Sequence, residues 1–121
     1  MKKILVVDDE EFMRSILDDL LNVNYAVSRA ANGREALALI ENTEFDLIIT
    51  DLVMPEMNGI EMVMAVRTKN PDQKIIGISG GGGITGNFDY LPVVQLLGAD
   101  KIFAKPFDLH ELQEAVKEML T

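Results

Sequence analysis

The sequence predicts an α/β fold in which a doubly wound parallel sheet of five strands is covered by five helices on its two faces. Short runs rich in Ile and Val, too brief for helices, recur along the chain. Segments with the apolar spacing of amphipathic helices lie between these runs. Acidic, hydroxyl and basic side chains follow several of the runs, at the strand ends where open parallel sheets bind ligands.

Four of the runs are apolar enough to form buried strands, and they lie at residues 3–7, 46–50, 74–79 and 101–104. A fifth and weaker strand is expected at residues 25–30, where the sequence YAVSRA alternates only in part. The alternation of these strands with helices is what favours a parallel sheet with helices on both faces.

The first and last helices are indicated by apolar stripes and by possible caps. The first stripe comprises Met13, Ile16, Leu17, Leu20 and Leu21. Asp9 is a candidate N-cap of this helix, and Asp108 with Glu111 forms a capping-box pattern before the last one. The apolar face of the last helix comprises Leu109, Leu112, Val116, Met119 and Leu120. Three more helices are expected at residues 33–42, 58–69 and 88–97.

Length and composition predict one soluble, cytoplasmic domain spanning residues 1–121. The 20 acidic and 11 basic residues make a net charge of −9, which disfavours direct binding of DNA or RNA phosphates. The chain has no cysteine, no secretory-type N-terminus and no apolar stretch long enough for membrane insertion. Because no residues are left for an output domain, a signal is expected to pass by protein contact, and the start at Met1 with the complete last helix argues against a missing N-terminal domain.

The stretch KILVVDDEE places adjacent acids at the end of the first strand. Two like charges about 4 Å apart repel by about 4 kcal/mol at an effective dielectric constant near 20, so a cation is expected beside Asp8 and Asp9. The carboxyl ends of parallel strands meet at one edge of the sheet, where the third strand ends in Asp51, the fourth in Ser79 and the fifth in Lys105. These side chains are therefore expected to form one site.

The motifs at these strand ends resemble those of the receiver domain of two-component response regulators, in the single-domain style of the chemotaxis regulators. They are VVDDE, IITDLVMPEMNG, GISG and FAKPFD, and the resemblance runs from residue 3 to residue 120. Each motif alone is weak evidence, but all four in order at consecutive strand ends are specific. The resemblance implies a flavodoxin-like sheet with strand order 2-1-3-4-5.

The resemblance also implies that Asp51 is a phosphoacceptor. An aspartate, with a reference pKa of about 3.9, is ionised at neutral pH and needs no base to act as an oxygen nucleophile. The surrounding carboxylates would repel an incoming phosphoryl group unless a cation intervened, and Mg²⁺ suits such oxygen ligands. The implied ligands are Asp9, Asp51, the backbone carbonyl of Val53 and, through a water, Asp8.

The phosphoryl group is expected to be bound by Ser79 and Lys105, and movement of the Ser79 hydroxyl would change the following loop. The Lys105–Pro106 peptide bond is expected to be cis. Ile102 stands where the family usually has an aromatic switch residue, and Phe103 is expected on the other side of the strand.

Two further departures from the family pattern concern loops. The four glycines at residues 80–83 suggest a loop that becomes ordered when a phosphoryl group binds. A phosphate-binding loop is the alternative, but the Gly-Lys-Ser/Thr sequence of the Walker motif is absent here. The side chains of Val53 and Gly81 cannot position a hydrolytic water, so slow self-dephosphorylation is expected.

Each site residue also has a plainer interpretation. Asp8 and Asp9 could cap the first helix, and Asp51 could be a turn residue. Ser79 could be an ordinary strand-end residue, and Lys105 a solvated surface lysine. Two other function classes stay open: a pseudo-receiver that acts only as an interaction module, and a small metal-dependent phosphohydrolase, although the D-x-D spacing usual for that chemistry is absent.

The leading interpretation is a signalling phosphoacceptor, not an enzyme, that takes its phosphoryl group from a sensor histidine kinase or a phosphotransfer protein. It would signal to an unknown protein through residues 91–97, Lys101 and residues 110–113. A phosphate sink or a relay intermediate is an alternative. His110 is expected at the surface with no ligand role.

Overall fold

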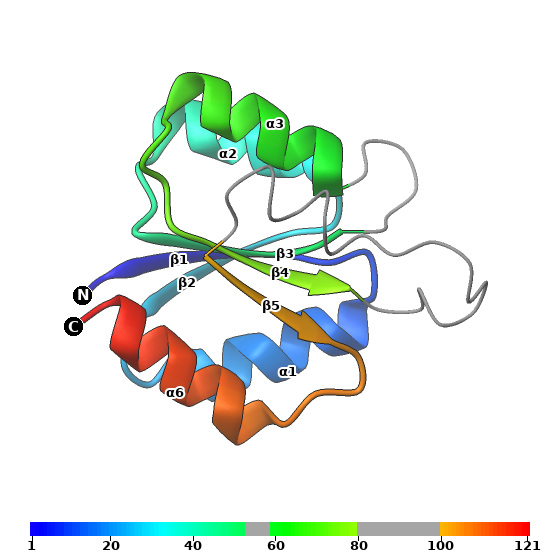
Figure 1. The fold of residues 1–121 in the computed structure, drawn as a ribbon, viewed down its shortest axis with the longest axis vertical. Coiled ribbons are helices and arrows are strands. Elements are labelled where there is room, and N and C mark those ends of the chain that lie inside the picture. Colours follow the sequence, from blue (N-terminus) through cyan, green and yellow to red (C-terminus); the bar gives the residue numbers. More distant parts are fainter. Residues whose placement is uncertain (53–58, 80–99) are drawn as a thin grey trace.

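A computed structural model describes residues 1–52, 59–79 and 100–121 of the chain. Within them lies one parallel sheet of five strands in the order β2-β1-β3-β4-β5, as predicted (Figure 1). The strands are β1 (Lys3–Val7), β2 (Ala26–Ala30), β3 (Leu47–Asp51), β4 (Ile75–Ser79) and β5 (Lys101–Ala104). Their bounds agree with the expected ranges to within one residue.

Four helices belong to the described residues, and they cover both faces of the sheet. They are α1 (Glu11–Leu21), α2 (Gly33–Asn42), α3 (Gly59–Lys69) and α6 (Leu109–Met119). Helices α2 and α3 lie on one face, and α1 and α6 lie on the other (Figure 1). The arrangement confirms the doubly wound fold, whereas the helix expected at residues 88–97 lies outside the described residues.

The core has two parts, one on each face of the sheet, because successive side chains of a strand point to opposite faces. Ile4 and Val6 of β1 pack toward α1 and α6, together with Leu17 of α1. Leu5 and Val7 pack toward α2 and α3, together with Met62 of α3. Every residue of β1 after Lys3 and every residue of β3 is buried, as expected for central strands of a parallel sheet.

Helix caps agree with the sequence at α6 but not at α1. The Asp108 side chain accepts hydrogen bonds from the backbone N–H groups of His110 (2.7 Å) and Glu111 (3.3 Å). The expectation that Asp9 caps α1 is wrong, because Glu10 occupies the N-cap and its side chain makes no capping hydrogen bond. The first helix therefore begins one residue later than Asp9 would allow.

At the amino ends of the strands, on the side of the sheet away from the carboxyl ends, the buried side chain of Gln73 links two loops. Its side-chain amide donates hydrogen bonds to the carbonyl oxygens of Phe45 (3.0 Å) and Lys74 (3.3 Å). Arg67 of α3 donates to the backbone carbonyls of Gln73 and Pro71. These bonds tie the loop before β3 to the loop before β4. Among the described residues, no helix has the length and apolar character required to cross a bilayer.

Candidate functional site

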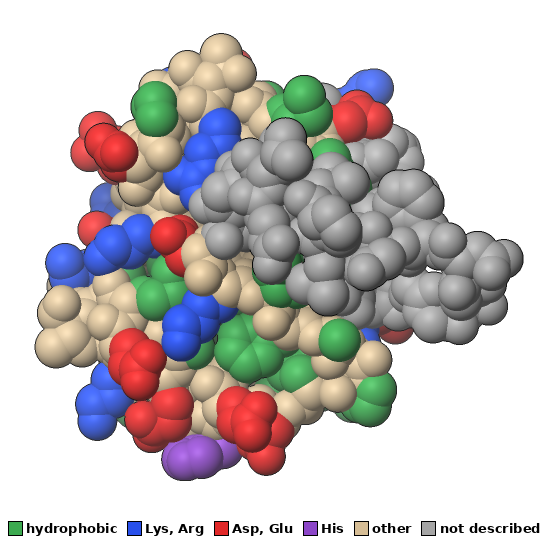
Figure 2. Space-filling view, viewed as in Figure 1, with side chains coloured by type: hydrophobic (Ala, Val, Ile, Leu, Met, Phe, Trp, Pro, Cys, Tyr) green, Lys and Arg blue, Asp and Glu red, His purple; other side chains and the backbone are tan. Residues whose placement is uncertain are grey.

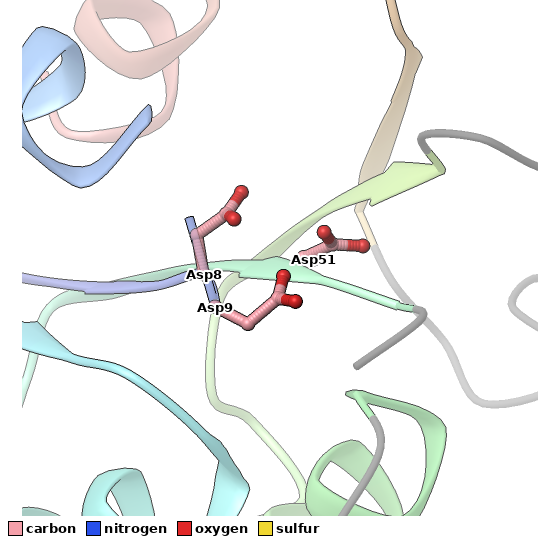
Figure 3. Close-up of side chains that lie close together, drawn as sticks. All are labelled: Asp8, Asp9 and Asp51. Carbon is pink, nitrogen blue, oxygen red and sulfur yellow. The ribbon is translucent and has the colours of Figure 1, made fainter. Parts of the chain in front are cut away.

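Three aspartates meet beyond the carboxyl ends of β1 and β3 (Figure 3). Val7 pairs with Thr50 in the sheet, so Asp8 follows β1 directly beside Asp51, the last residue of β3. One carboxylate oxygen from each of Asp8, Asp9 and Asp51 lies within 4.8 Å of the others. Asp8 and Asp51 are buried, whereas Asp9 is exposed. The expected convergence of these three acids is therefore present.

Lys105, which follows β5, extends its ammonium group into this cluster. Its Nζ donates hydrogen bonds to Asp8 Oδ2 and Asp51 Oδ2, each at 3.3 Å, and to Glu10 Oε1 at 3.1 Å. Only 17% of the Lys105 side chain is exposed, so the interpretation as a solvated surface lysine is wrong. The peptide bond between Lys105 and Pro106 is cis.

The charges in the site shift the protonation of two groups. Burial raises the pKa of Asp8, and the nearby Asp9 carboxylate adds to the rise, while hydrogen bonds from the Glu10 backbone and from Lys105 offset part of it. For Lys105, burial by itself would lower the pKa, but the carboxylates of Asp51 and Asp8 outweigh burial and raise it. Lys105 is therefore fully charged at neutral pH.

Backbone contacts hold the acids in place. Asp8 Oδ1 accepts a hydrogen bond from the Glu10 N–H (2.9 Å), and Arg14 Nη1 donates to the Asp8 carbonyl (2.7 Å). The start of α3 approaches β3 so closely that a Cβ on Gly59 would lie 2.0 Å from the Asp51 carbonyl oxygen. Only a residue without a side chain fits there.

The donor set fits a small, hard cation. Three carboxylates face one ammonium group, so the site carries an excess of negative charge that Lys105 does not cancel. Oxygen ligands from few carboxylates, with room left for water, are what Mg²⁺ prefers in proteins. Asp8, Asp9 and Asp51 therefore suit a divalent ion such as Mg²⁺.

An apolar pocket of about 410 Å³ opens beside Lys105. It is lined by Met13, Ile16, Lys105, Pro106, Phe107 and Leu109. Hydrophobic side chains also reach the surface between β5 and α6 (Figure 2). Phe107 packs against Phe103 with ring centroids 6.0 Å apart. The charged site thus adjoins an apolar surface formed by α1 and the segment that leads into α6.

Several residues predicted to act in the site lie outside the described part of the chain. Val53 and residues 80–83 belong to this group, and of Ser79 only the backbone is described, paired with Ala104 at the end of β4. Their predicted roles stay predictions. By contrast, His110 is exposed and 3.9 Å from Glu114, as expected of a surface residue.

Ile102 and Phe103 of β5 face opposite sides of the sheet, as expected from the alternation of side chains along a strand. Phe103 packs into the core beneath α1 and α6. Ile102 is partly buried and pairs with Gly77 of β4. A Cβ added at Gly77 would point toward the Leu52 side chain, on the other side of the sheet from Phe103. Phe103 therefore lies on the side of the sheet opposite Ile102, and the role predicted for position 102 stays a prediction.

Sequence reasoning assigned no role to Glu10 or Arg14, which contact the site. Glu10 was visible only as one acid in the run DDEE, although its position directly after the acid pair was a usable signal. Gly59 was visible as turn chemistry in the motif MNG. Neither pattern reveals the contact made in the folded chain, which is with Lys105 for Glu10 and with the backbone of Asp51 for Gly59.

Comparisons with known proteins agree with this geometry. The family model of the response regulator receiver domain matches residues 4–117. Sporulation initiation phosphotransferase F of Bacillus subtilis is 34% identical over 120 residues, which cover 98% of this chain and 94% of that protein. Chemotaxis protein CheY of Thermotoga maritima is 34% identical over 122 residues, covering 98% of this chain and 97% of that protein.

Solved structures show the same similarity. Response regulator TrrA of Thermotoga maritima, in complex with Mg(2+)-BeF, is 36% identical with a TM-score of 0.83, and the match covers 98% of this chain and 99% of that chain. Chemotaxis protein CheY4 of Vibrio cholerae is 31% identical with a TM-score of 0.83, and 98% of each chain is covered.

Proposed function

Because this chain belongs to the response regulator receiver domain family of two-component signalling, we propose that Asp51 accepts a phosphoryl group in a Mg²⁺-dependent reaction. The observation that carries the proposal is the position of the Asp51 carboxylate. It lies within 4.8 Å of the Asp8 and Asp9 carboxylates and 3.3 Å from the Lys105 ammonium group. The nucleophile, the cation site and the positive charge that the proposed reaction requires would thus lie together at the carboxyl ends of the strands.

The chemistry requires little of the protein beyond placement and charge neutralisation. A carboxylate oxygen of Asp51 forms a bond to phosphorus while the bond between phosphorus and the donor atom breaks, and the electron pair leaves with the donor. Asp9, Asp51 and the Val53 carbonyl would bind Mg²⁺ directly and Asp8 would bind it through water. The bound ion supplies positive charge against the phosphoryl oxygens.

Lys105 neutralises a further phosphoryl oxygen as a point charge, and its raised pKa keeps it protonated for this role. Ser79 would donate its hydroxyl to the same group. That hydrogen bond would move the loop after β4, so that phosphorylation changes the shape of the protein surface.

The donor we propose is a sensor histidine kinase or a phosphotransfer protein in the cytoplasm. The apolar pocket beside Lys105 supports a protein donor, because an apolar surface next to a charged site suits contact with a partner protein. The output would be contact with a downstream protein through residues 91–97, which lie outside the described residues, together with Lys101 and residues 110–113. The relative named a phosphotransferase keeps the relay role open.

Slow loss of the phosphoryl group is part of the proposal. It rests on Val53 and Gly81, whose side chains have no group that could hold an attacking water. A phosphoryl lifetime of seconds would count against it.

The test is intact-mass analysis after incubation with acetyl phosphate, with and without Mg²⁺. The native chain should gain one phosphoryl group, about 80 Da, only with Mg²⁺, and Asp51→Asn should gain none. If the folded native chain gains nothing from acetyl phosphate or from purified kinases, a pseudo-receiver that acts only as an interaction module becomes the better interpretation. Continuous turnover of a phosphate ester would instead indicate a phosphohydrolase.

A further inference from the structure

We propose that Glu10 is a positioning residue that holds the Lys105 ammonium group in the unphosphorylated protein and releases it when Lys105 binds the phosphoryl group. The inference rests on the proposed phosphoacceptor function and adds a competitor to it. Its basis is the 3.1 Å hydrogen bond from Lys105 Nζ to Glu10 Oε1, between residues 95 positions apart in the chain.

The hydrogen-bonding capacity of Lys105 is fully used. An ammonium group has three N–H donors and no acceptor. Within the described residues, Lys105 Nζ donates to three carboxylates, those of Asp8, Asp51 and Glu10. A phosphoryl oxygen can therefore bind Lys105 only if one of these bonds is lost.

Glu10 is the partner whose bond costs least to lose. The side chains of Asp8 and Asp51 are 1% and 5% exposed. Loss of the Lys105 bond to either of them would therefore remove the ammonium group from a buried carboxylate. The Glu10 side chain is 62% exposed, and water can replace Lys105 there. Phosphorylation removes the charge on the bonded Asp51 oxygen but places new negative charge nearby, which favours keeping Lys105 inside and repels the Glu10 carboxylate.

The start of α1 provides a second, independent observation. The N-caps of α2 and α6 are Asn32 and Asp108, and both side chains accept hydrogen bonds from the backbone of their helix. Glu10 occupies the same position in α1 and makes no such bond. A short polar side chain there would stabilise the helix by about 1 kcal/mol. The longer glutamate instead extends across to Lys105.

The consequence is a restraint on phosphorylation. An incoming anion must compete with Glu10 for Lys105, so Glu10 lowers both the rate of phosphorylation and the affinity for a phosphoryl analogue. The restraint acts through Lys105, which separates it from the general effect of a negative charge near the site.

The experiment compares the native chain with Glu10→Gln, which preserves the size of the side chain and removes its charge. Glu11→Gln is the matched control, because it removes the same charge from the next residue of the same helix end. At saturating Mg²⁺, the rate constant with acetyl phosphate and the affinity for beryllofluoride are measured. We expect Glu10→Gln to increase both by about three- to fivefold, and Glu11→Gln to change them by less than about 1.5-fold.

Two further variants separate a contact with Lys105 from a general field. Glu10→Asp keeps the charge but shortens the side chain by one methylene, so it should behave like Glu10→Gln in both measurements. In a Lys105→Met background, Glu10→Gln should have no more effect than Glu11→Gln. Circular dichroism confirms that each variant is folded.

The outcomes distinguish the inference from the function on which it rests. If the native chain is phosphorylated on Asp51 and Glu10→Gln matches it or is slower, the inference is wrong while the phosphoacceptor function stands. An equal gain from Glu11→Gln, or a gain that persists without Lys105, would also overturn it. If the native chain neither gains a phosphoryl group nor binds beryllofluoride, the proposed function fails, and the inference fails with it.

Discussion

Single residues set the position of the Asp51 carboxylate, and Gly59 is the clearest case. The first turn of α3 passes against the backbone of Asp51 and Leu52, and the added Cβ would meet backbone atoms of both at 2.0 to 2.8 Å. Backbone atoms cannot rotate away as a side chain does. The identity of residue 59 therefore affects where Asp51 lies.

Gly59→Ala should displace Asp51, destabilise the fold by about 1 to 3 kcal/mol and slow phosphorylation by acetyl phosphate. Gly77→Ala is the control, because the three atoms nearest to its Cβ would belong to the Leu52 side chain, at 3.2 to 3.4 Å. The control should cost less than about 1 kcal/mol, since that side chain can adjust. Urea unfolding and the acetyl phosphate assay measure the two effects. Equal losses in both variants would show that the close approach at Gly59 is not special.

Asp8 is a residue that serves the site at the expense of stability. Its folded-state pKa is raised, chiefly by burial, above the ordinary value of 3.8. Below pH 3.8 the carboxyl is neutral in the folded and the unfolded chain, and its contribution to stability is fully present. That contribution is lost as the pH rises through the folded-state pKa, because the folded protein must then hold a buried charge.

Asp8→Asn should therefore be more stable than the native chain at pH 7 without Mg²⁺, and the difference should disappear near pH 3.8. The asparagine can still accept the Glu10 N–H. We expect a gain on the order of 1 kcal/mol, or about 3 to 6 °C in Tm. Thermal unfolding at both pH values measures it, with Asp19→Asn as an exposed, charge-matched control. A variant that unfolds at the native temperature at pH 7 would contradict this account.

At the scale of elements, the ends of helices and strands divide between function and stability. The site lies at the carboxyl ends of the strands, whereas Gln73 links the loops at the opposite edge. Its amide donates a hydrogen bond to the carbonyl of the buried Phe45, and a buried backbone acceptor is costly to leave without such a bond. The two edges of the sheet should respond differently to substitution.

Gln73→Ala should destabilise the protein by about 1 to 3 kcal/mol, because it leaves the Phe45 carbonyl unsatisfied and opens a gap. The rate of phosphorylation should change by less than about twofold at temperatures where the variant is folded, since Gln73 is remote from Asp51. Urea unfolding and the acetyl phosphate assay check the two parts. Thr68→Ala, at an exposed position near the end of α3, is the control. A large loss of rate in folded Gln73→Ala would show that the two edges are coupled.

The whole molecule carries a net charge of −9, and within the described residues three carboxylates converge in one site with a single ammonium group. Such an arrangement gains stability from any cation that binds the folded chain in preference to the unfolded one. Binding of Mg²⁺ should therefore appear in the stability of the complete fold.

Adding Mg²⁺ at ten times its dissociation constant should raise the free energy of unfolding by about 1.4 kcal/mol at pH 7. The gain should shrink as the pH falls toward 3.8, since protons compete for the carboxylates and the raised pKa of Asp8 makes that competition begin earlier. Thermal unfolding with Mg²⁺, against Na⁺ at equal ionic strength, measures it. Asp51→Asn should lose most of the gain, and an unchanged gain in that variant would place the ion elsewhere.

The sequence by itself determined the fold class, the strand bounds to within one residue, and the acids and lysine that meet at the strand ends. These follow from local patterns, since apolar runs form strands and the residue after each run must lie at the edge of the sheet. Only the tertiary structure decided how Glu10 and Gly59 act. Glu10, and not Asp9 as the sequence suggested, is the N-cap of α1. The Glu10 side chain accepts a hydrogen bond from Lys105 and none from the backbone of the helix. Both contacts, from Glu10 to Lys105 and from Gly59 to the backbone of Asp51, depend on distances that only the folded chain sets, and no local pattern contains those distances.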